Sequence, residues 1–395
     1  MKKRALVLTI VFSCFAAFAV IGLSVFGLFF FKNKNNILTP PTPNKDDEEI
    51  IIDPTTYPDI PDSTIASQFD VSPIYEGFTL VGYKINGATE EAVQNGKLII
   101  PKAYHSLPIL AIGNAFNNWT EIEQIVLPDT LIYVGVENSA GSFKGCSALA
   151  QVQFPEGNKI QNIGDNAFYN CTELSAFDFG TNLKSIGDNA FCYTKIETVS
   201  LPASTNSIGT NPFAFSNLKT IIISTASSVY ESSNNCIIEK ETNKLVVGSQ
   251  NGQIKDGVEV VGENAFAGVV TSGNIVFPSS VQVVEKGAFK LFDGNIELNA
   301  GLKTIKSEAF FGSTVVLEGV PDSVEEIGSE VFYGCENLAE TFIARGVIKI
   351  GLVVFANTPV INLTLHIGVV AETEDDVDYK TGSIIENVYY YDPAE

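Results

Sequence analysis

A short phrase that mixes apolar and polar residues returns along this chain at nearly regular intervals. It is clearest at Ile163-Gly164-Asp165-Asn166-Ala167-Phe168, and close copies occupy residues 186–191, 261–266 and 327–332. Weaker copies end at Phe116, Phe143, Phe213, Phe289, Phe310 and Phe355. Most successive phenylalanines lie 21 to 27 residues apart, but Phe213 and Phe266 are 53 apart. A fixed period of about 20–50 residues is typical of stacked repeats, so the pattern predicts a solenoid.

The second half of each repeat carries the phrase Leu-x-x-Leu-x-Leu, which is typical of a leucine-rich repeat strand. In the copy that starts at Gly180 it is formed by Ile196, Val199 and Leu201. Because alternate residues of a strand face opposite sides, we expect one pair of residues per strand to point into the solenoid. The pairs are Ile125/Leu127, Val152/Phe154, Phe177/Phe179, Val199/Leu201, Ile221/Ile223, Ile275/Phe277, Ile296/Leu298, Thr341/Ile343 and Leu363/Leu365.

The Ala-Phe pair is expected to close the other side of each coil, with phenylalanine rings stacked between neighbouring coils. The glycine before it, such as Gly164 or Gly187, is expected to supply backbone freedom at a tight bend. Cys146, Cys171 and Cys335 each lie three residues after a repeat phenylalanine. One shared position predicts small buried side chains rather than a set of disulfides.

This pattern closely resembles the BspA-like leucine-rich repeats, whose period runs roughly Ile-Pro-x-x-Val-x-x-Ile-Gly-x-x-Ala-Phe-x-x-Cys-x-x-Leu-x-x-Val. The resemblance covers about residues 75–370 in some ten copies, and Lys97–Tyr104 also looks like the opening of such an array. It implies a repeat solenoid of α/β type, mostly β, with a parallel sheet on one face and irregular or short helical turns opposite. Members of the family are mostly surface or secreted proteins, and several bind host proteins.

The ends of the array and its one long interval predict less regular segments. Residues 71–111 are expected to form an N-terminal cap with strands at Phe78–Lys84 and Lys97–Ile100, and residues 112–370 the solenoid. In an irregular coil at about 230–260, Asn235–Glu239 and Lys244–Val247 predict a hairpin, which is either a harmless insertion or a binding protrusion. Residues 371–395 predict an acidic cap with a final strand, because the end of a solenoid exposes a strand edge and core.

Residues 1–31 predict a membrane anchor. Met1-Lys2-Lys3-Arg4 precedes an uncharged run from Ala5 to Phe31, which is longer than a secretory signal core of about 7–15 residues. We expect one transmembrane helix in the cell membrane, with the N-terminus inside and the repeat domain outside. The alternative is a secreted protein after cleavage near Ala17–Ala19. Residues 32–70, rich in proline and acidic residues, predict an extended extracellular linker.

Composition and motifs argue against several classes of function. The net charge of −22 disfavours nucleic acid, whose phosphates need a basic surface. The only histidines, His105 and His366, are far apart in sequence, and no Cys-x-x-Cys pair, phosphate-binding loop or nucleophile motif occurs. We therefore predict no enzyme, catalytic residue, cofactor or metal site. A carboxylate pair for glycoside cleavage among the many acidic residues stays open as an alternative.

The outward-facing positions of the strands are the predicted partner-binding face. The middle residues of successive strands are Val126, Gln153, Asp178, Ser200, Ile222, Val276, Glu297, Phe342 and Thr364. The residues just before them include Gln124, Gln151, Thr198, Thr220, Asn274, Asn295 and Asn362. The apolar points on this largely neutral face either anchor an extracellular or host protein or are ordinary scattered surface residues. We expect a membrane-anchored surface protein in adhesion or host interaction; the alternatives are a passive surface antigen or spacer, and a cell-envelope enzyme.

Overall fold

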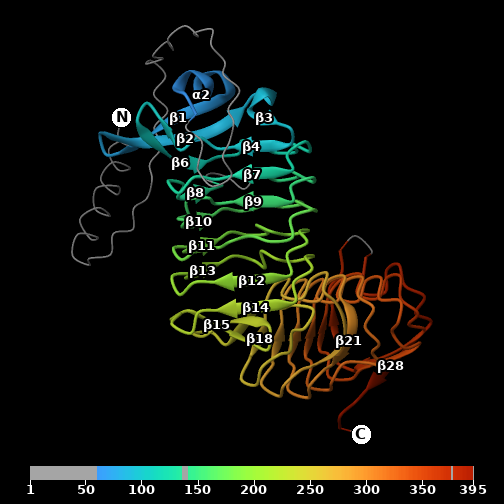
Figure 1. The fold of residues 1–395 in the computed structure, drawn as a ribbon. Helices are drawn as coiled ribbons and strands as arrows, with labels where there is room; N and C mark the ends of the chain where they lie inside the picture. Colours follow the sequence, from blue (N-terminus) through green and yellow to red (C-terminus); the bar gives the residue numbers. More distant parts are fainter. Residues whose placement is uncertain (1–59, 136–140, 375–376, 395) are drawn as a thin grey trace, which may run out of the picture.

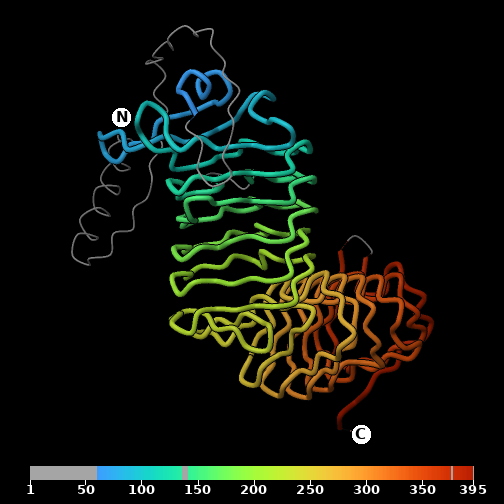
Figure 2. The backbone as a smooth tube through the Cα atoms, viewed as in Figure 1, coloured from blue at the N-terminus to red at the C-terminus, as the bar shows by residue number. Residues whose placement is uncertain are grey.

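The structure is a computed structural model of the chain, and it describes residues 60–135, 141–374 and 377–394. Coils stack from the N-terminal cap down to β14 (Thr220–Ile223), and the second half of the solenoid extends sideways from there to β28 (Asn387–Tyr391) (Figures 1 and 2). The transmembrane helix predicted in residues 1–31 and the linker up to residue 59 lie outside the described residues. In the part of the chain that is described, no helix has the length and apolar character needed to cross a membrane.

A mixed cap covers the first coil. It consists of α2 (Asp62–Gln68), the antiparallel pair β1 (Phe69–Glu76) and β2 (Thr79–Ala88), η1 (Glu90–Ala92), β3 (Val93–Gln94) and β5 (Ala103–Tyr104). Residues 60–70 were expected in the linker, but Ile65 and Phe69 are buried in the same hydrophobic core as the first coils. Because these two apolar side chains are surrounded in sequence by polar residues, the composition of the segment predicted a linker instead of part of the cap.

The Leu-x-x-Leu-x-Leu phrase forms the first of two ladders of parallel strands. Strands β4 (Lys97–Ile99), β7 (Gln124–Val126) and β9 (Gln151–Gln153) pair in that order. The ladder continues in three further sheets, β12-β14, β19-β21 and β24-β26-β28. Their remaining strands are β12 (Thr198–Leu201), β19 (Val270–Val276), β21 (Asp293–Glu297), β24 (Thr341–Ala344) and β26 (Asn362–His366). Val199 and Leu201 of β12 are buried and Ser200 between them is exposed, as the alternation predicts.

A second parallel ladder stands where the sequence predicts irregular or short helical turns. It starts at β6 (Leu107–Ile112), which pairs with β2, and continues through strands of two residues at the Ile-Gly part of the phrase. These are β8 (Tyr133–Val134), β10 (Asn162–Ile163), β11 (Ser185–Ile186), β13 (Ser207–Ile208), β18 (Val260–Val261), β20 (Val283–Val284), β22 (Thr304–Ile305), β23 (Glu326–Ile327), β25 (Lys349–Ile350) and β27 (Val370–Ala371). The helices that the structure describes, α2 and η1, both lie in the cap, so the described repeats are strands and turns.

The glycine and the asparagine of the repeated phrase have different roles. Asn166 and Asn189 have φ of 54° and 55°, a left-handed conformation that asparagine tolerates better than most residues. Gly187 does not have positive φ, but a Cβ there would collide with Oδ1 of Asp165 in the preceding coil. The expectation that the glycine supplies freedom at the bend is therefore wrong for Gly164 and Gly187, although Gly135 in the coil of Phe143 has a φ of 83°. The asparagine makes the bend, and the glycine lets adjacent coils approach each other.

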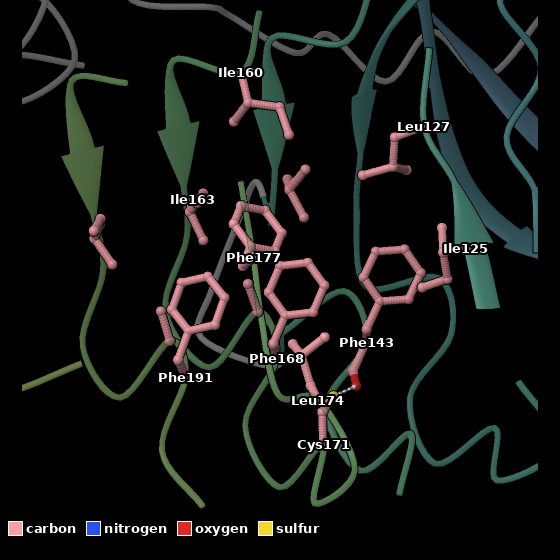
Figure 3. Packing of buried hydrophobic residues seen from close by; sticks show 14 of the residues in the cluster. Ile125, Leu127, Phe143, Ile160, Ile163, Phe168, Cys171, Leu174, Phe177 and Phe191 are labelled. Atoms are coloured by element: carbon pink, nitrogen blue, oxygen red, sulfur yellow. Dashed lines mark hydrogen bonds between the residues drawn. The ribbon is translucent and has the colours of Figure 1, made fainter. Parts of the chain in front are cut away.

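Phenylalanine rings of successive coils stack as predicted, but in two separate runs. The N-terminal stack has ring centroids 5.2, 5.3, 5.2 and 5.5 Å apart and joins Phe116, Phe143, Phe168, Phe191 and Phe213. The C-terminal stack, with spacings of 5.1, 5.4, 5.7 and 5.8 Å, joins Phe266, Phe289, Phe310, Phe332 and Phe355. Figure 3 shows Phe143, Phe168 and Phe191 side by side with Phe177 packed beside them.

The coil with the long interval, residues 224–250, separates the two stacks and is called the junction coil below. It contains β15 (Tyr230–Ser233), β16 (Cys236–Glu239) and β17 (Lys244–Val247), and the predicted hairpin is present because β16 and β17 pair antiparallel. Gly248 takes the place of the repeat phenylalanine: its N–H donates to the carbonyl of Ala265 (2.7 Å), and a Cβ would collide with the ring of Phe266. The hydrophobic interior divides into two large clusters at this coil.

The cysteine position is filled by buried, hydrogen-bonded side chains. Cys146, Cys171 and Cys335 are buried and free, as predicted, and so are Cys192 and Cys236; Cys14 lies outside the described ranges. The thiol of Cys146 donates to the carbonyl of Phe116 and that of Cys171 to the carbonyl of Phe143, each over 3.1 Å. Thr194 takes the same position in another coil, and its hydroxyl donates to the carbonyl of Phe191 (2.9 Å). This position therefore satisfies a backbone carbonyl group, of the preceding coil for Cys146 and Cys171 and of its own coil for Thr194.

Candidate partner-binding face

The outer side of the first ladder carries two parallel rows of side chains. The middle row contains the predicted residues that are exposed, namely Gln153, Asp178, Ser200, Ile222, Val276 and Glu297. The ladder registers bring neighbours of this row together: Ser200 lies opposite Ile222 and Val276 opposite Glu297. These residues share one face because each follows a residue that points into the solenoid; Asp178 takes this position although residues 174–179 form no strand.

Two predicted members of the row are buried instead. Phe342 is 0% exposed and stacks against Phe332 and Phe355 inside the C-terminal stack. The phrase Thr341-Phe342-Ile343-Ala344 is shifted by one residue from the predicted register, so Ile343 takes the outer position and Ala344 is buried. A shift of one residue moves every side chain of a strand to the opposite face. Val126 is 3% exposed although it lies between Ile99 and Gln153 in its ladder.

The row before the middle row is made of amides and hydroxyls, as the sequence predicts. Neighbouring side chains hydrogen-bond along the ladder: Gln124 donates to Gln151 (3.2 Å), and Asn387 donates to Asn362 (2.9 Å). Asn274 and Asn295 occupy paired positions in β19 and β21. This row is therefore a ribbon of uncharged polar groups beside the middle row.

The exposed apolar residues of the middle row lie on both sides of the junction coil. Ile222 is 51% exposed on β14, the last first-ladder strand before the junction, and Val276 is 45% exposed on β19, the first one after it. Sequence reasoning missed Tyr389 of β28, which is 56% exposed and lies opposite Thr364 in the same row. The signal was present, because Val388-Tyr389-Tyr390-Tyr391 was predicted as a final strand but was not aligned with the row.

Two shallow pockets open on the second ladder rather than on this face. One, of about 470 Å³, follows β8 to β13 past Asp165 and Asp188, and the other, of about 310 Å³, lies beside the junction coil and is lined by Asp188, Tyr230 and Glu239 among others. Oδ1 of Asp165 accepts the N–H of Asp188 (2.8 Å), and Oδ1 of Asp188 accepts the N–H of Thr210 (2.7 Å). These carboxylates thus cap the backbone of the next coil.

The described residues show no concentration of reactive groups. Burial raises the pKa of the Cys146 and Cys192 thiols to about 12, so these thiols stay neutral and are poor nucleophiles at neutral pH. Within the described ranges, no group of three or more histidine, cysteine or acidic side chains is arranged to hold a metal ion. His105 pairs with Asp62 on the surface of the cap, with Nδ1 3.1 Å from Oδ2.

Comparisons with known proteins agree with the repeat pattern and the fold. A family model described as a BspA type leucine rich repeat region (6 copies) matches residues 112–244, 248–292 and 259–371. No curated protein matches the chain. The crystal structure of the pneumococcal vaccine antigen PcpA is similar with a TM-score of 0.58 at 14% identity, over 82% of this chain and 96% of that one. A leucine rich cell surface protein from Faecalibacterium prausnitzii aligns over 87% of this chain and 95% of that one at 18% identity, with a TM-score of 0.44. The chain belongs to the family of BspA-type leucine-rich repeat proteins.

Proposed function

We propose that this protein binds a protein partner at the cell surface through the outer face of its first ladder, across the junction coil. The exposure of Ile222 and Val276, 51% and 45%, carries the proposal. Apolar residues on a sheet surface that is otherwise polar are the usual anchors of a protein interface, because a few buried contacts supply most of the binding energy. Their positions on either side of the junction would centre the interface there.

The chemistry of the two rows defines the partner. The members of the rows are amides, hydroxyls, apolar residues, two carboxylates, Asp178 and Glu297, and one lysine, Lys97 of β4, which lies opposite Gln124 at the N-terminal end. Such a surface fits a partner that presents an apolar patch within a neutral or mildly basic surround. Ten strands spaced by about 4.8 Å give a ribbon near 45 Å long, enough for a standard interface of about 800 Å² per partner. Binding should depend only weakly on salt.

We also propose that residues 5–31 anchor the protein in the cell membrane and that the repeats face outward. The uncharged run behind Lys2, Lys3 and Arg4 supports this orientation. Protease added to intact cells should remove the repeats and leave a short membrane-bound fragment. Full protection of the repeats in intact cells, with cleavage only after lysis, would contradict it.

The partner-binding proposal is tested with the full chain in detergent and an array of purified secreted and cell-surface proteins. Proteins that bind saturably are then tested against the double variant Ile222→Asp, Val276→Asp, checked for folding by circular dichroism. The matched control is Leu291→Asp, Ile348→Asp, which replaces two similarly exposed apolar residues (48% and 45%) away from the middle row. We expect only the first variant to lose binding. Equal binding by both variants would place the site elsewhere, and no saturable binder at all would favour a passive surface antigen.

A further inference from the structure

The C-terminal end of the solenoid carries exposed apolar side chains beside exposed acidic residues such as Glu372 and Glu386. Among the described residues, six of the fifteen exposed large hydrophobic side chains lie in the last stretch: Ile367, Val370, Ile384, Tyr389, Tyr390 and Tyr391. Val388 and Tyr390 of β28 occupy the inward positions opposite Leu363 and Leu365, but Tyr390 is 57% exposed. Apolar groups gathered at the end of a stack usually mark an interaction surface.

Strand β28 is also an open sheet edge. It ends the sheet β24-β26-β28, and no described residue pairs with its outer side. Asn387 donates its N–H to Ile361, and Tyr391 accepts the N–H of Ile367, so the backbone groups of these odd-numbered residues point toward β26. Because backbone groups alternate along a strand, the N–H and C=O groups of Val388 and Tyr390 point to the open edge. Such an edge is a template for another strand.

We propose that two copies of this chain join end to end through antiparallel pairing of their β28 strands, with the two-fold axis at Tyr389. In this register Val388 lies opposite Tyr390 of the second copy, and the reverse pair follows by symmetry. Both residues direct their backbone groups to the open edge, so each pair exchanges two N–H···O bonds. Tyr389 meets its own copy at the axis, and Asn387 lies opposite Tyr391. A two-fold contact of this kind is closed and self-complementary.

Charge and side-chain order favour a second copy as the occupant. The strand Asn387–Tyr391 carries no charge in a chain of net charge −22, so it is a place where two copies can meet without burying like charges. One tyrosine is already held in position, because the guanidinium of Arg345 lies 5.5 Å from the ring of Tyr391. Tyrosine–tyrosine and tyrosine–valine cross-strand pairs stabilise sheets.

The same register also brings like charges of the two copies together, which gives the dimer a characteristic dependence on salt. Glu386 of one copy lies near Asp392 of the other at each end of the paired strands. This repulsion is screened by salt, so dimerisation should increase with ionic strength, whereas a contact built on ion pairs would weaken. The paired strands would also join the outer faces of the two first ladders into one continuous ribbon.

Disulfide trapping in the full chain tests the proposal. Tyr389→Cys is made with Cys14→Ser, so that the cysteine in residues 1–59 does not contribute; the other five cysteines are buried. Side chains at a central antiparallel pair have Cβ atoms about 4.5–5.5 Å apart, close enough to cross-link under mild oxidation. The matched control is Ile222→Cys, an exposed position on the same face far from β28. A second variant adds Val388→Pro, which removes an edge N–H where proline is tolerated.

We expect a disulfide-linked dimer from Tyr389→Cys, little from Ile222→Cys, and loss of the dimer when Val388→Pro is added to a chain that remains folded. The dimer should increase between about 0.05 M and about 0.5 M salt. The proposal is overturned if Tyr389→Cys cross-links no better than the control, or if Val388→Pro leaves the dimer intact. A dimer trapped only between Tyr389→Cys and a different, co-purifying protein would assign the edge to a foreign strand and also overturn it.

Discussion

The two phenylalanine stacks and the junction coil between them are built from the same repeat but pack differently. In each stack, a ring covers the ring of the next coil at 5.1–5.8 Å. In the junction coil, Gly248 lies where a ring would stand, and the chain inserts an antiparallel hairpin. Strand pairing is interrupted there as well, because β17 pairs with β18 but no described strand pairs with the far side of β13, and the hydrophobic core also divides at this coil. Strand pairing and ring stacking thus both stop at the junction, so we expect the two halves to respond separately to damage.

The largest expected difference between the stacks concerns alkaline pH. The coils of the N-terminal stack hold three buried thiols, Cys146, Cys171 and Cys192, whereas the C-terminal core contains two, Cys236 of the junction coil and Cys335. Burial raises the pKa of Cys335 to about 11 and of Cys146 and Cys192 to about 12, and raises that of Cys171 well above its ordinary value. Below the ordinary thiol pKa both states keep their protons and stability does not change. Above it the unfolded chain ionises first, so stability falls until the folded pKa is reached.

For each thiol, this difference in pKa lowers the free energy of unfolding by about 1.4 kcal/mol per pH unit, or by about 2 kcal/mol in all at pH 10. With three thiols the N-terminal stack should therefore lose about 6 kcal/mol, and with two thiols the C-terminal core about 4 kcal/mol. Trp119, the single tryptophan, contacts Phe116 at 5.5 Å and reports on the N-terminal stack. Its urea midpoint under reducing conditions should fall more steeply with pH than the midpoint from circular dichroism. In the variant Cys146→Ser, Cys171→Ser the slope should become shallower, and an unchanged slope would refute the linkage.

Removal of one ring from either stack should be the next largest effect. Phe191 lies between Phe168 and Phe213, and Phe310 lies between Phe289 and Phe332, each fully buried. Phe191→Ala and Phe310→Ala should each lower the free energy of unfolding by about 3–5 kcal/mol. Phe78→Ala, at a fully exposed ring, is the control and should change it by less than about 0.5 kcal/mol. Urea unfolding measures all three, and a loss below about 1 kcal/mol for the buried rings would contradict the stacking.

A smaller effect is expected where the junction replaces the ring by glycine. Gly248→Ala places a Cβ against the ring of Phe266, so the coil or the ring must shift. Overpacking of this kind costs about 1–3 kcal/mol. Gly87→Ala is the matched control, because its Cβ would meet only the Cβ of Asp70 at 3.8 Å. If thermal unfolding shows the two alanine variants to be equally stable, Gly248 is not packed as described.

The smallest effect should come from the ion pairs that link successive coils in both halves. Lys195 pairs with Glu173 (2.7 Å) in the first half, and Lys303 pairs with Glu325 (3.1 Å) in the second, all on the surface. Exposed pairs contribute about 0–1 kcal/mol, and salt screens them. Lys195→Ala and Lys303→Ala should each shift the urea midpoint slightly at low salt and not measurably at high salt. A larger loss at high salt would show that these lysines act through packing instead.

The ring stacks and most of the first ladder were predictable because many copies of the repeat show the same register of apolar residues. The second ladder was missed because its strands are two residues long, too short for a visible alternation. Phe342 was placed on the wrong face because it adjoins Ile343, and two adjacent apolar residues fit either register. The role of Gly248 depends on contact between residues that are separate in sequence, and no local pattern encodes that contact.

Hydrogen exchange on the full chain, compared between Phe191→Ala and Phe310→Ala, tests the central claim that the junction coil separates two packed halves. The claim predicts that Phe191→Ala lowers amide protection in the coils between Phe116 and Phe213 and leaves those between Phe266 and Phe355 unchanged. Phe310→Ala should do the reverse, because each ring supports only its own stack. If either variant lowers protection equally in both halves, the solenoid unfolds as one unit and the separation is refuted.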